Sequence, residues 1–369
     1  MRNLSLTFLL LTSVVIEPAA ARVWRDISGK YEIEAELVKD NGETVQLEKA
    51  DGKVISVQVA HLSQADQAYL KRLHSRAAAE AAGARLGEAL ETRLTIGIWI
   101  TGQQGTVNGL TSAIAIPAVW PEQEFKVLAT DKTPQVRKIT YRNHPGGSRQ
   151  MVIQVPHLSG GETAKATITF LLRRRPIMPP TDTSIYRLPK SPPREVRTFL
   201  LGTPGIDVRN TRIRKIAEQL AEGDPGGWEL AQKTFKWVTE NLEYTAGDLK
   251  GAVWAAQHGK GDCEEYTSLF IALCRANGIP ARAVWVPGHC YAEFYLEDDL
   301  GQGHWFPCDG VAKLFGQVPA TQPILQKGDS FHVPELKDKG PQRYLGQTLT
   351  GKIGQGAAQP DLGTILELR

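Results

Sequence analysis

The feature that most constrains the fold is a capped helix that begins at a cysteine, in the stretch GKGDCEEYTSLFIALCRANGIPARAV. Asp262 is a favourable N-cap and Glu265, three residues later, completes a capping box, so Cys263 is expected to be the first helical residue. An Asn-Gly pair followed by proline should end the helix. Backbone N–H groups and the dipole at the helix start favour a thiolate, whereas Glu264 and Glu265 oppose it. The stretch predicts a buried helix with a candidate nucleophile on its first turn.

Two residues that would complete a thiol triad follow in segments with the pattern of strands. His289 lies in GHCYAEFYL and Asp309 in HWFPCD, separated by the turn DDLGQG. A hairpin turn near Leu300 is compatible with a register that sets His289 directly opposite Asp309. A carboxylate in that place would hold the imidazole tautomer and support the imidazolium. Cys263 would approach from the helix packed on this sheet.

From Ala231 to Gly310 the chain resembles the transglutaminase-like superfamily of papain-type thiol enzymes. Four motifs carry the resemblance in order: G-x-C at the helix start, R-A-x-G-I-P-A-R from Arg275 to Arg282, H-x-x-x-E at His289 and Glu293, and P-x-D at Pro307 and Asp309. The resemblance implies a Cys-His-Asp triad of Cys263, His289 and Asp309. Members of the superfamily cross-link glutamine to lysine, cleave amide bonds, or have lost activity. One departure is Cys290-Tyr291, where the family more often has Ala-Trp.

The other cysteines suggest a disulfide rather than a second reactive site. In the register above, Cys290 and Cys308 would be cross-strand neighbours on the face away from the active site, and we expect them to form a disulfide. Cys274 is too far along the helix to reach Cys263 and is expected in the core. A zinc set of His289, Cys290, His304 and Cys308 is disfavoured, because adjacent strand residues point to opposite faces. No metal or other cofactor is expected.

The oxyanion of a tetrahedral intermediate needs hydrogen-bond donors. The backbone N–H of Cys263 is one candidate. Gln257, six residues upstream, is a second candidate at a spacing that papain-like enzymes use, and Trp254 competes with it. Both side chains could instead be packing residues.

The N-terminus has the pattern of a secretory signal peptide. Arg2 precedes the apolar run LTFLLLTSVVI, and small residues follow up to Ala21. Cleavage near Ala21 would remove residues 1–21 and leave an exported protein, periplasmic or secreted; an uncleaved anchor is the alternative. No later apolar segment is long enough to cross a bilayer, so no stable membrane span is expected after cleavage.

Residues 22–73 show short alternating strands separated by Asn-Gly and Asp-Gly turns, which predicts a small SH3-like β-barrel. The segments RVWRDISGKYEIEAEL and VQLEKADGKVISVQVAHLSQADQAYL resemble the Sla-homology domain of endocytic adaptor proteins. That resemblance implies a module that binds short peptides, so a peptide ligand is a possible partner of this barrel. Fold carries over more safely than ligand.

The remaining boundaries follow from changes in pattern. We expect a helical linker at 74–91, a β-sandwich at 92–172, a Pro-rich linker at 173–198, a transglutaminase-like α+β domain at 199–330 and a C-terminal extension at 331–369. The run Arg173-Arg174-Arg175 is expected to be a solvated strand end, with a patch for an anionic partner as the alternative. The chain is thus expected to be multidomain.

Charge is nearly balanced, with 43 Lys+Arg against 40 Asp+Glu, so no nucleic-acid partner is indicated. The expected function is an exported cysteine peptidase or transglutaminase-like enzyme that hydrolyses peptide or glutamine amide bonds through a thioester on Cys263. Its partner would be a protein or peptide substrate. Two alternatives stay open: glutamine–lysine cross-linking, and a catalytically silent binding protein that docks through the barrel.

Overall fold

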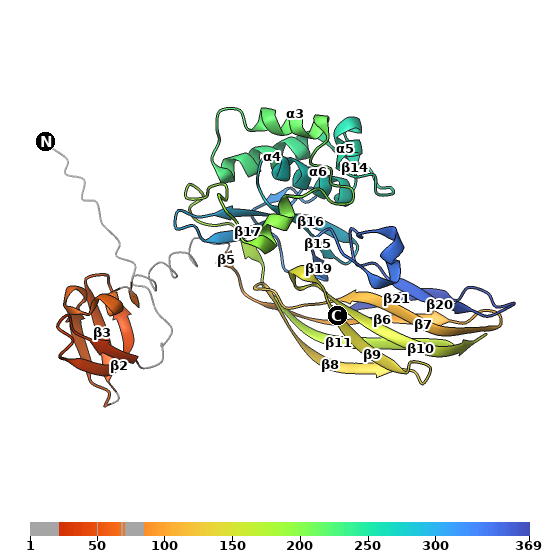
Figure 1. Ribbon diagram of the computed structural model, residues 1–369, viewed down its shortest axis with the longest axis horizontal. Coiled ribbons are helices and arrows are strands. Elements are labelled where there is room, and N and C mark those ends of the chain that lie inside the picture. Colours follow the sequence, from red (N-terminus) through yellow and green to blue (C-terminus); the bar gives the residue numbers. More distant parts are fainter. Residues whose placement is uncertain (1–21, 50, 68, 71–84) are drawn as a thin grey trace. The chain divides into compact units, whose positions relative to one another are not determined.

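The computed structural model describes residues 22–49, 51–67, 69–70 and 85–369. These residues fall into two compact units, which divide between Ala81 and Ala82 (Figure 1). The segment expected as a signal peptide, 1–21, and most of the helical linker expected at 74–91 lie outside the described residues. The last residues of that linker are extended, because β5 (Arg85–Leu86) pairs with β12 (Ile177–Met178) and β6 begins at Leu90.

The N-terminal unit is an antiparallel meander of four strands in the order β1-β2-β3-β4. Its elements are β1 (Arg22–Arg25), β2 (Glu32–Asp40), β3 (Thr44–Lys49), β4 (Val54–Gln58) and the 3₁₀ turn η1 (Val59–His61). Trp24, Leu37 and Leu47 lie in its core, and the Trp24 indole donates to the carbonyl of Ala35. A β-bridge between Asp26 and Leu62 brings the chain after η1 back to β1, as closure of a small barrel requires.

Two four-stranded antiparallel sheets form the sandwich, with orders β20-β7-β10-β9 and β21-β6-β11-β8 (Figure 1). Alternating apolar residues of facing strands, such as Ile96, Ile98, Met151 and Ile168, fill the space between the sheets. The strands are β6 (Leu90–Thr101), β7 (Thr106–Ile116), β8 (Gln123–Lys132), β9 (Lys138–Asn143), β10 (Arg149–Ser159), β11 (Thr163–Arg174), β20 (Thr348–Ile353) and β21 (Asp361–Leu368). The 3₁₀ turn η2 (Pro145–Gly147) joins β9 to β10.

The C-terminal residues complete the sandwich instead of extending from the molecule. β20 pairs with β7 and β21 pairs with β6 along its whole length, so the segment expected as an extension at 331–369 supplies one strand to each sheet. The sandwich therefore encloses the α+β domain in sequence. Strand patterns alone placed its end at 172, because pairing between residues that lie far apart in the sequence, such as Thr348 with Ala113 and Asp361 with Thr101, leaves no local signal.

The α+β domain has one antiparallel sheet, β18-β17-β16-β15-β19, covered on one side by helices. The strands are β15 (Ala281–Val286), β16 (His289–Glu297), β17 (Gly303–Asp309), β18 (Leu314–Phe315) and β19 (Gln326–Lys327), and the helices are α3 (Thr211–Leu220), α4 (Gly227–Asn241), α5 (Ala252–His258) and α6 (Cys263–Ala276). Shorter elements are α2 (Arg194–Arg197), η3 (Thr198–Leu200), η4 (Pro334–Lys339) and the parallel pair β13 (Glu243–Tyr244) with β14 (Lys260–Gly261).

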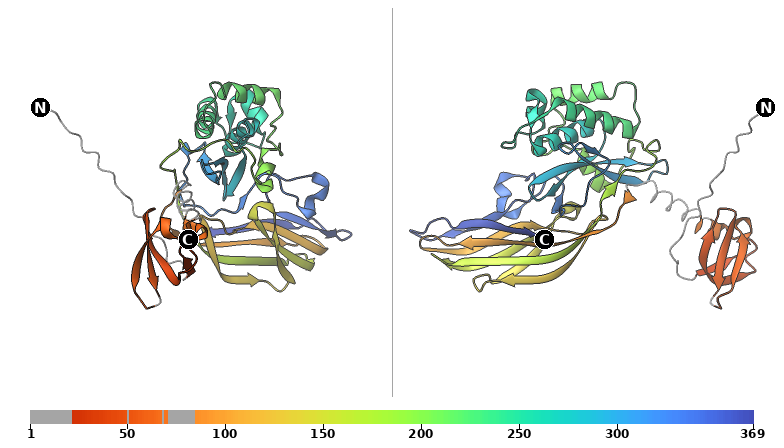
Figure 2. Two further views of the ribbon diagram at one scale, coloured as in Figure 1. Left: turned by 60° about the vertical axis from the view of Figure 1, so that its left-hand side comes forward. Right: turned by 180° about the vertical axis from the view of Figure 1, so that it is seen from behind.

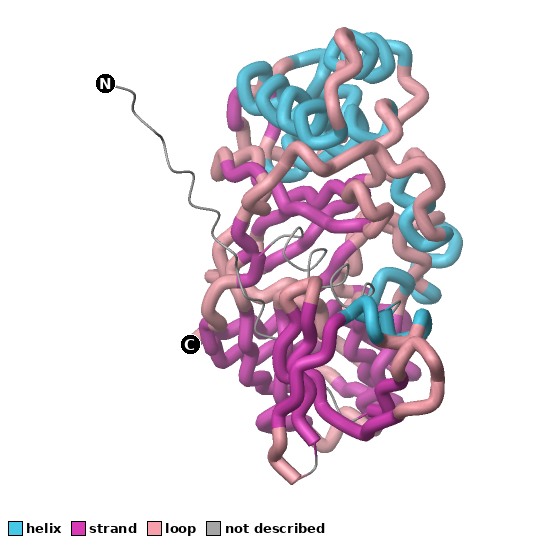
Figure 3. Tube along the Cα trace, turned by 90° about the vertical axis from the view of Figure 1, so that its left-hand side faces the viewer, coloured by secondary structure: helices cyan, strands magenta, loops and turns pink. Residues whose placement is uncertain are grey.

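Within the second compact unit, Ala82–Arg369, the helices, the five-stranded sheet and the sandwich form successive layers (Figures 2 and 3). Side chains of β16 alternate between the two interfaces. Cys290 and Phe294 join the core beneath α6, whereas Tyr291 joins the cluster with Trp120 and Ile177 on the sandwich side. Both faces of the central strand are thus buried, and functional groups must lie at its ends.

Candidate active site

Helix α6 begins as the sequence predicts, with Cys263 as its first residue and a complete capping box. The Asp262 carboxylate accepts from the N–H of Glu264 at 2.8 Å, and the Glu265 carboxylate accepts from the N–H of Asp262 at 3.2 Å. Glu265 also accepts from the N–H groups of Lys250 and Gly251, at 2.8 and 3.0 Å. A Cβ on Gly261 would lie only 2.1 Å from the Glu265 Cβ, so glycine is required for this closure. These hydrogen bonds fix the start of α6 and with it the position of Cys263, the candidate nucleophile.

His289 and Asp309 meet at the ends of neighbouring strands. His289 Nε2 lies 2.6 Å from Asp309 Oδ2, while Asp309 Oδ1 accepts from the N–H groups of Val311 and Ala312 at 3.0 Å each. Asp309 therefore both caps the turn that follows β17 and orients the imidazole. With Nε2 engaged, Nδ1 is the ring nitrogen left for the Cys263 thiol.

The register that brings these residues together differs from the predicted one by two positions. Glu293 pairs with Pro307 and Glu297 with Gly303, so His289 lies beyond the last paired residue and reaches Asp309 diagonally. The reason is the hairpin turn, in which the Asp298 carboxylate accepts from Leu300 N and Gln302 N at 2.9 Å each. A shift of two residues keeps each side chain on its face, which is why the triad still forms.

Electrostatics at the site favour a thiolate–imidazolium pair. Hydrogen bonds from Cys290, and then from His289, lower the pKa of Cys263 to about 4 although burial opposes this. Hydrogen bonds to Asp309, and then to Cys263, raise the pKa of His289 to about 10. Between these values the sulfur is negative and the ring is positive. A charged thiolate is the form of cysteine that attacks carbonyl carbon.

The predicted disulfide is wrong, because all four cysteines are free thiols in the structure. Cys308 pairs with Ala292, not with Cys290, owing to the shifted register. Both cysteines also lie on the helix-covered face, where the Cys290 sulfur is 3.6 Å from Thr267 Oγ1 on α6. Cys290 therefore borders Cys263, a position that its sequence context did not reveal. Cys274 is fully buried, as expected, and burial raises its pKa.

Neither side chain considered for the oxyanion hole bonds to the triad among the residues the structure describes. Gln257 is exposed on α5. The Trp254 ring stacks on His258, with centroids 4.5 Å apart, and lies under the Lys250 ammonium at 4.3 Å. The oxyanion assignment thus stays a prediction, with the Cys263 N–H at the helix start as its simplest form. His304 does not lie with His289 in one zinc site, because its Nε2 is 2.9 Å from Asp298 Oδ2 at the other end of the strand.

A buried charged cluster holds the sheet against the sandwich, and it contains the motif residues Arg282 and Glu293. Arg282 and Lys327 both bond to the buried Glu293, at 2.7 and 2.6 Å, and Lys327 also bonds to Glu122 at 2.5 Å. Glu122 directly precedes β8, so this cluster spans the layer boundary. Burial alone would raise the pKa of Glu293, but the charges of Lys327 and then of Arg282 outweigh burial and lower the pKa to about 2. Motif residue Arg275 is likewise fully buried and pairs with Asp329 at 2.7 Å.

Sequence reasoning also missed Arg343, which lies in the supposed C-terminal extension. Its guanidinium donates to the carbonyl of Glu264 at 3.0 Å and to the hydroxyl of Ser268, and so anchors the first turns of α6. Only its long-range contact identifies it, since nothing around it in the sequence suggests a site.

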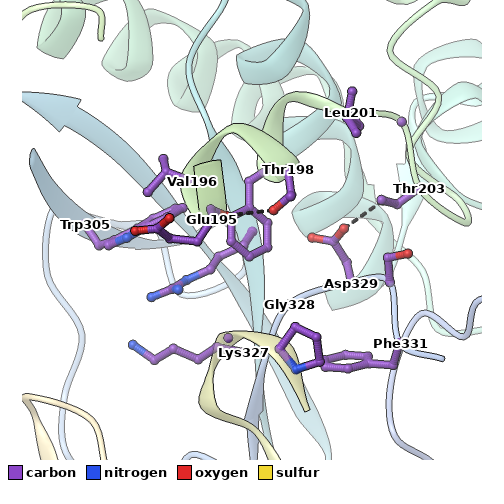
Figure 4. A pocket seen from close by; sticks show the side chains of 16 residues that line it. Glu195, Val196, Thr198, Leu201, Thr203, Trp305, Lys327, Gly328, Asp329 and Phe331 are labelled. Atoms are coloured by element: carbon purple, nitrogen blue, oxygen red, sulfur yellow. Dashed lines mark hydrogen bonds between the residues drawn. The ribbon is translucent and has the colours of Figure 1, made fainter. Parts of the chain in front are cut away.

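Two of the cavities along the α+β domain concern the candidate site. One, of about 130 Å³, is lined by His289 and Asp309 together with Arg174, Val286, Tyr291, Val318, Pro319, Thr321 and Gln322. A larger one, of about 430 Å³, is lined by none of the triad residues. Figure 4 shows its walls: Glu195 and Thr198 on one segment, Trp305 on β17, and Lys327 to Asp329 opposite, with Thr203 bonded to Asp329. Its buried charged groups are already in ion pairs, so its inner wall offers no unused charge.

The described part of the chain contains no helix long and apolar enough to cross a membrane. It also contains no cluster of three or more His, Cys, Asp or Glu side chains arranged to hold a metal ion.

Comparisons with known proteins agree with this architecture. Residues 214–310 match the family model of the transglutaminase-like superfamily, and residues 15–78 match that of SLA1 homology domain 1. No curated protein matches the chain. The structure is similar to that of a proposed cysteine protease from Cytophaga hutchinsonii, with a TM-score of 0.52 and 16% identity over 77% of this chain and 92% of the other.

Two further solved structures are more distant. The periplasmic domain of TgpA from Pseudomonas aeruginosa, bound to ethylmercury, matches with a TM-score of 0.28 and 14% identity, over 65% of this chain and 94% of the other. A proposed protease from Parabacteroides distasonis matches with a TM-score of 0.24 and 11% identity, over 78% of this chain and 56% of the other.

Proposed function

We propose that residues 199–330 form a thiol enzyme that hydrolyses peptide bonds or glutamine side-chain amides through a thioester. The single observation that carries the proposal is the convergence of Cys263 at a helix start, His289 on β16 and Asp309 on β17. The lowered pKa of the thiol and the raised pKa of the imidazole support it.

The reaction follows from these groups. The Cys263 thiolate attacks the amide carbonyl carbon, and a tetrahedral oxyanion forms near the N–H groups at the start of α6. The His289 imidazolium gives its proton to the leaving nitrogen, the C–N bond breaks, and a thioester remains on Cys263. His289, now neutral, takes a proton from water as it attacks the thioester. Collapse releases the carboxylic acid and restores the thiolate–imidazolium pair.

A peptide library containing Gln and Lys, read by mass spectrometry, tests this proposal. Cleaved peptides indicate a peptidase, and Gln-to-Glu conversion with release of ammonia indicates a deamidase. Lys-linked products would move the assignment to cross-linking, in which an amine replaces water. Hydrolysis comes first because water is always at hand in an exported setting. No product from the wild-type chain, together with an inert Cys263, would favour the silent binding protein.

We also propose that the protein is exported and that residues 1–21 are removed near Ala21. The positive start, apolar run and small-residue exit of the sequence support this. N-terminal sequencing of protein recovered from the periplasm or medium checks it, and an N-terminus at Met1 would contradict it.

The N-terminal unit is proposed to bind a short peptide, as the Sla-homology resemblance implies. An apolar cavity of about 190 Å³, lined by Trp24, Tyr31 and Ile33 among others, supports this role. This peptide ligand is separate from the substrate of the triad. Loss of the N-terminal unit should therefore weaken binding of the peptide ligand without abolishing the reactivity of the Cys263 thiol.

A further inference from the structure

Arg174, the last residue of sandwich strand β11, is a buried cation with no counter-charge among the described residues. It is only 4% exposed. Its Nη2 donates to the Tyr291 hydroxyl at 3.1 Å, and within the described residues it forms no ion pair and no second hydrogen bond. Burial raises the pKa of Tyr291, which keeps that partner neutral. The sequence-based expectation of a solvated strand end is therefore wrong for Arg174, although Arg173 beside it is exposed.

Three other buried or largely buried cations around the sheet differ from Arg174 in this respect. Each bonds to at least one carboxylate: Arg275 to Asp329, Arg282 to Glu293, and Lys327 to Glu122 and Glu293. Removing an unpaired guanidinium from water is costly, so a native buried cation normally has an anionic partner. Glu122 and Glu293 are already occupied. The part of the chain that the structure describes thus supplies no anion for Arg174.

Arg174 lines the cavity of about 130 Å³ that His289 and Asp309 also line; these two residues are called the catalytic pair below. Tyr291 follows His289 by two residues on β16, so both project from the same side of the strand. Pro319 and Thr321 are exposed residues of its wall, which gives access from solvent. The volume has room for several water molecules and therefore for a carboxylate on a short stem. A group held there would lie against His289 and Asp309.

We propose that Arg174 binds a substrate carboxylate beside the catalytic pair, so that the enzyme prefers acidic substrates. The inference rests on the proposed function and adds its specificity. Guanidinium binds carboxylate through charge-assisted, often paired, hydrogen bonds, and Arg174 has free N–H groups for them. A single negative charge matches a single arginine, whereas a doubly charged phosphate would face the nearby Asp309. The carboxylate could be the chain terminus of a peptide or the side chain of Asp or Glu.

Calorimetric binding to the full-length Cys263→Ser variant, in which turnover should be negligible during the titration, tests the proposal. Two matched pairs of probes are used: acetyl-Ala-Ala with a free carboxylate against its amide, and acetyl-Ala-Glu-Ala-amide against its Gln counterpart. In at least one pair, the acid should bind about 10-fold or more tightly. The pair that shows the preference identifies the source of the carboxylate. Adding Arg174→Met should abolish the preference, while adding Arg173→Met should preserve it.

The variants remain interpretable because Arg174→Met replaces an unpaired charge by a side chain of similar length, which should not destabilise the fold. Arg174→Lys, which retains charge but not the fork, should keep part of the preference. Equal binding of acid and neutral probes, or a preference that survives Arg174→Met, would overturn the inference. Arg174-dependent binding of inorganic phosphate alone would overturn the carboxylate assignment. Binding needs no turnover, so a preference for acidic probes would stand even if the wild-type enzyme proved inactive. If the wild-type enzyme is active but shows no such preference, only the role of Arg174 is refuted and the proposed function stands.

Discussion

The charges packed around the five-stranded sheet and those at its edge are arranged in opposite ways. Around the sheet lies a paired cluster, defined as Arg275, Arg282, Glu293, Lys327, Asp329 and Glu122, in which each charge bonds to an opposite one. At the edge lies a reactive edge, defined as Cys263, His289, Asp309 and Arg174. There, among the described residues, Arg174 has no counter-charge, and the lowered pKa of Cys263 favours the thiolate. The difference separates groups that fix the layers together from groups kept available for substrate.

The largest expected effect is on activity at the reactive edge. Cys263→Ser should lower amide hydrolysis about 10⁴-fold or more, because a serine hydroxyl stays protonated where the thiol is ionised. Cys274→Ala is the matched control on the same helix, and should retain activity in the folded fraction. Initial rates on a peptide found in the library screen measure both. Substantial turnover by Cys263→Ser would place the nucleophile elsewhere.

In the paired cluster the expected effect is on stability. Asp329→Ala leaves the fully buried Arg275 without its counter-ion and should lower the free energy of unfolding by about 3–5 kcal/mol. Asp299→Ala removes a pair with Arg187 in which both side chains are more than half exposed, and should cost less than about 1 kcal/mol. Urea denaturation followed by circular dichroism compares them. If both variants lose the same free energy of unfolding, the paired cluster stabilises the protein no more than a surface ion pair does.

Asp309→Asn should have an intermediate effect at the reactive edge. The amide can still bond to His289 but carries no charge, so the pKa of His289 should fall from about 10. The upper limb of the pH–rate profile then moves to lower pH, and the rate at neutral pH should drop by about 10- to 100-fold. Rates measured from pH 4 to 10.5 check this. An upper limb that stays in place would show that Asp309 does not act on the imidazole.

Cys290→Ala should have the smallest effect. Its hydrogen bond is the leading cause of the lowered pKa of Cys263, so its loss should raise that pKa by about one unit, the equivalent of one weak hydrogen bond. The midpoint of alkylation against pH would rise accordingly, while the rate above pH 7 should change little. An unaltered midpoint would assign the shift to His289 and the helix start alone.

Local signals in the sequence were sufficient for the start of α6, because capping and the helix stop involve residues a few positions apart. They were also sufficient to predict that His289 lies beside Asp309, since a two-residue slip in register leaves each side chain on its face. The slip itself came from Asp298, whose side chain sets the turn length in a way that a generic hairpin does not reveal.

Long-range pairing accounts for the larger misses. The strands at β20 and β21 and the anchor Arg343 depend on partners far away in the chain, so their sequence context resembles that of an ordinary tail. Arg174 was hidden for a related reason: an arginine in a basic run suggests solvent, and only the neighbouring β16 shows that it is enclosed.

The most direct measurement is the rate of Cys263 alkylation by iodoacetamide as a function of pH, followed by peptide mapping. The thiolate–imidazolium pair predicts a rate that is half-maximal near pH 4 and flat up to about pH 10, with the buried Cys274 and Cys308 unlabelled in the folded protein. A rate that instead climbs through pH 8 to 9, as for an ordinary cysteine, would contradict the account.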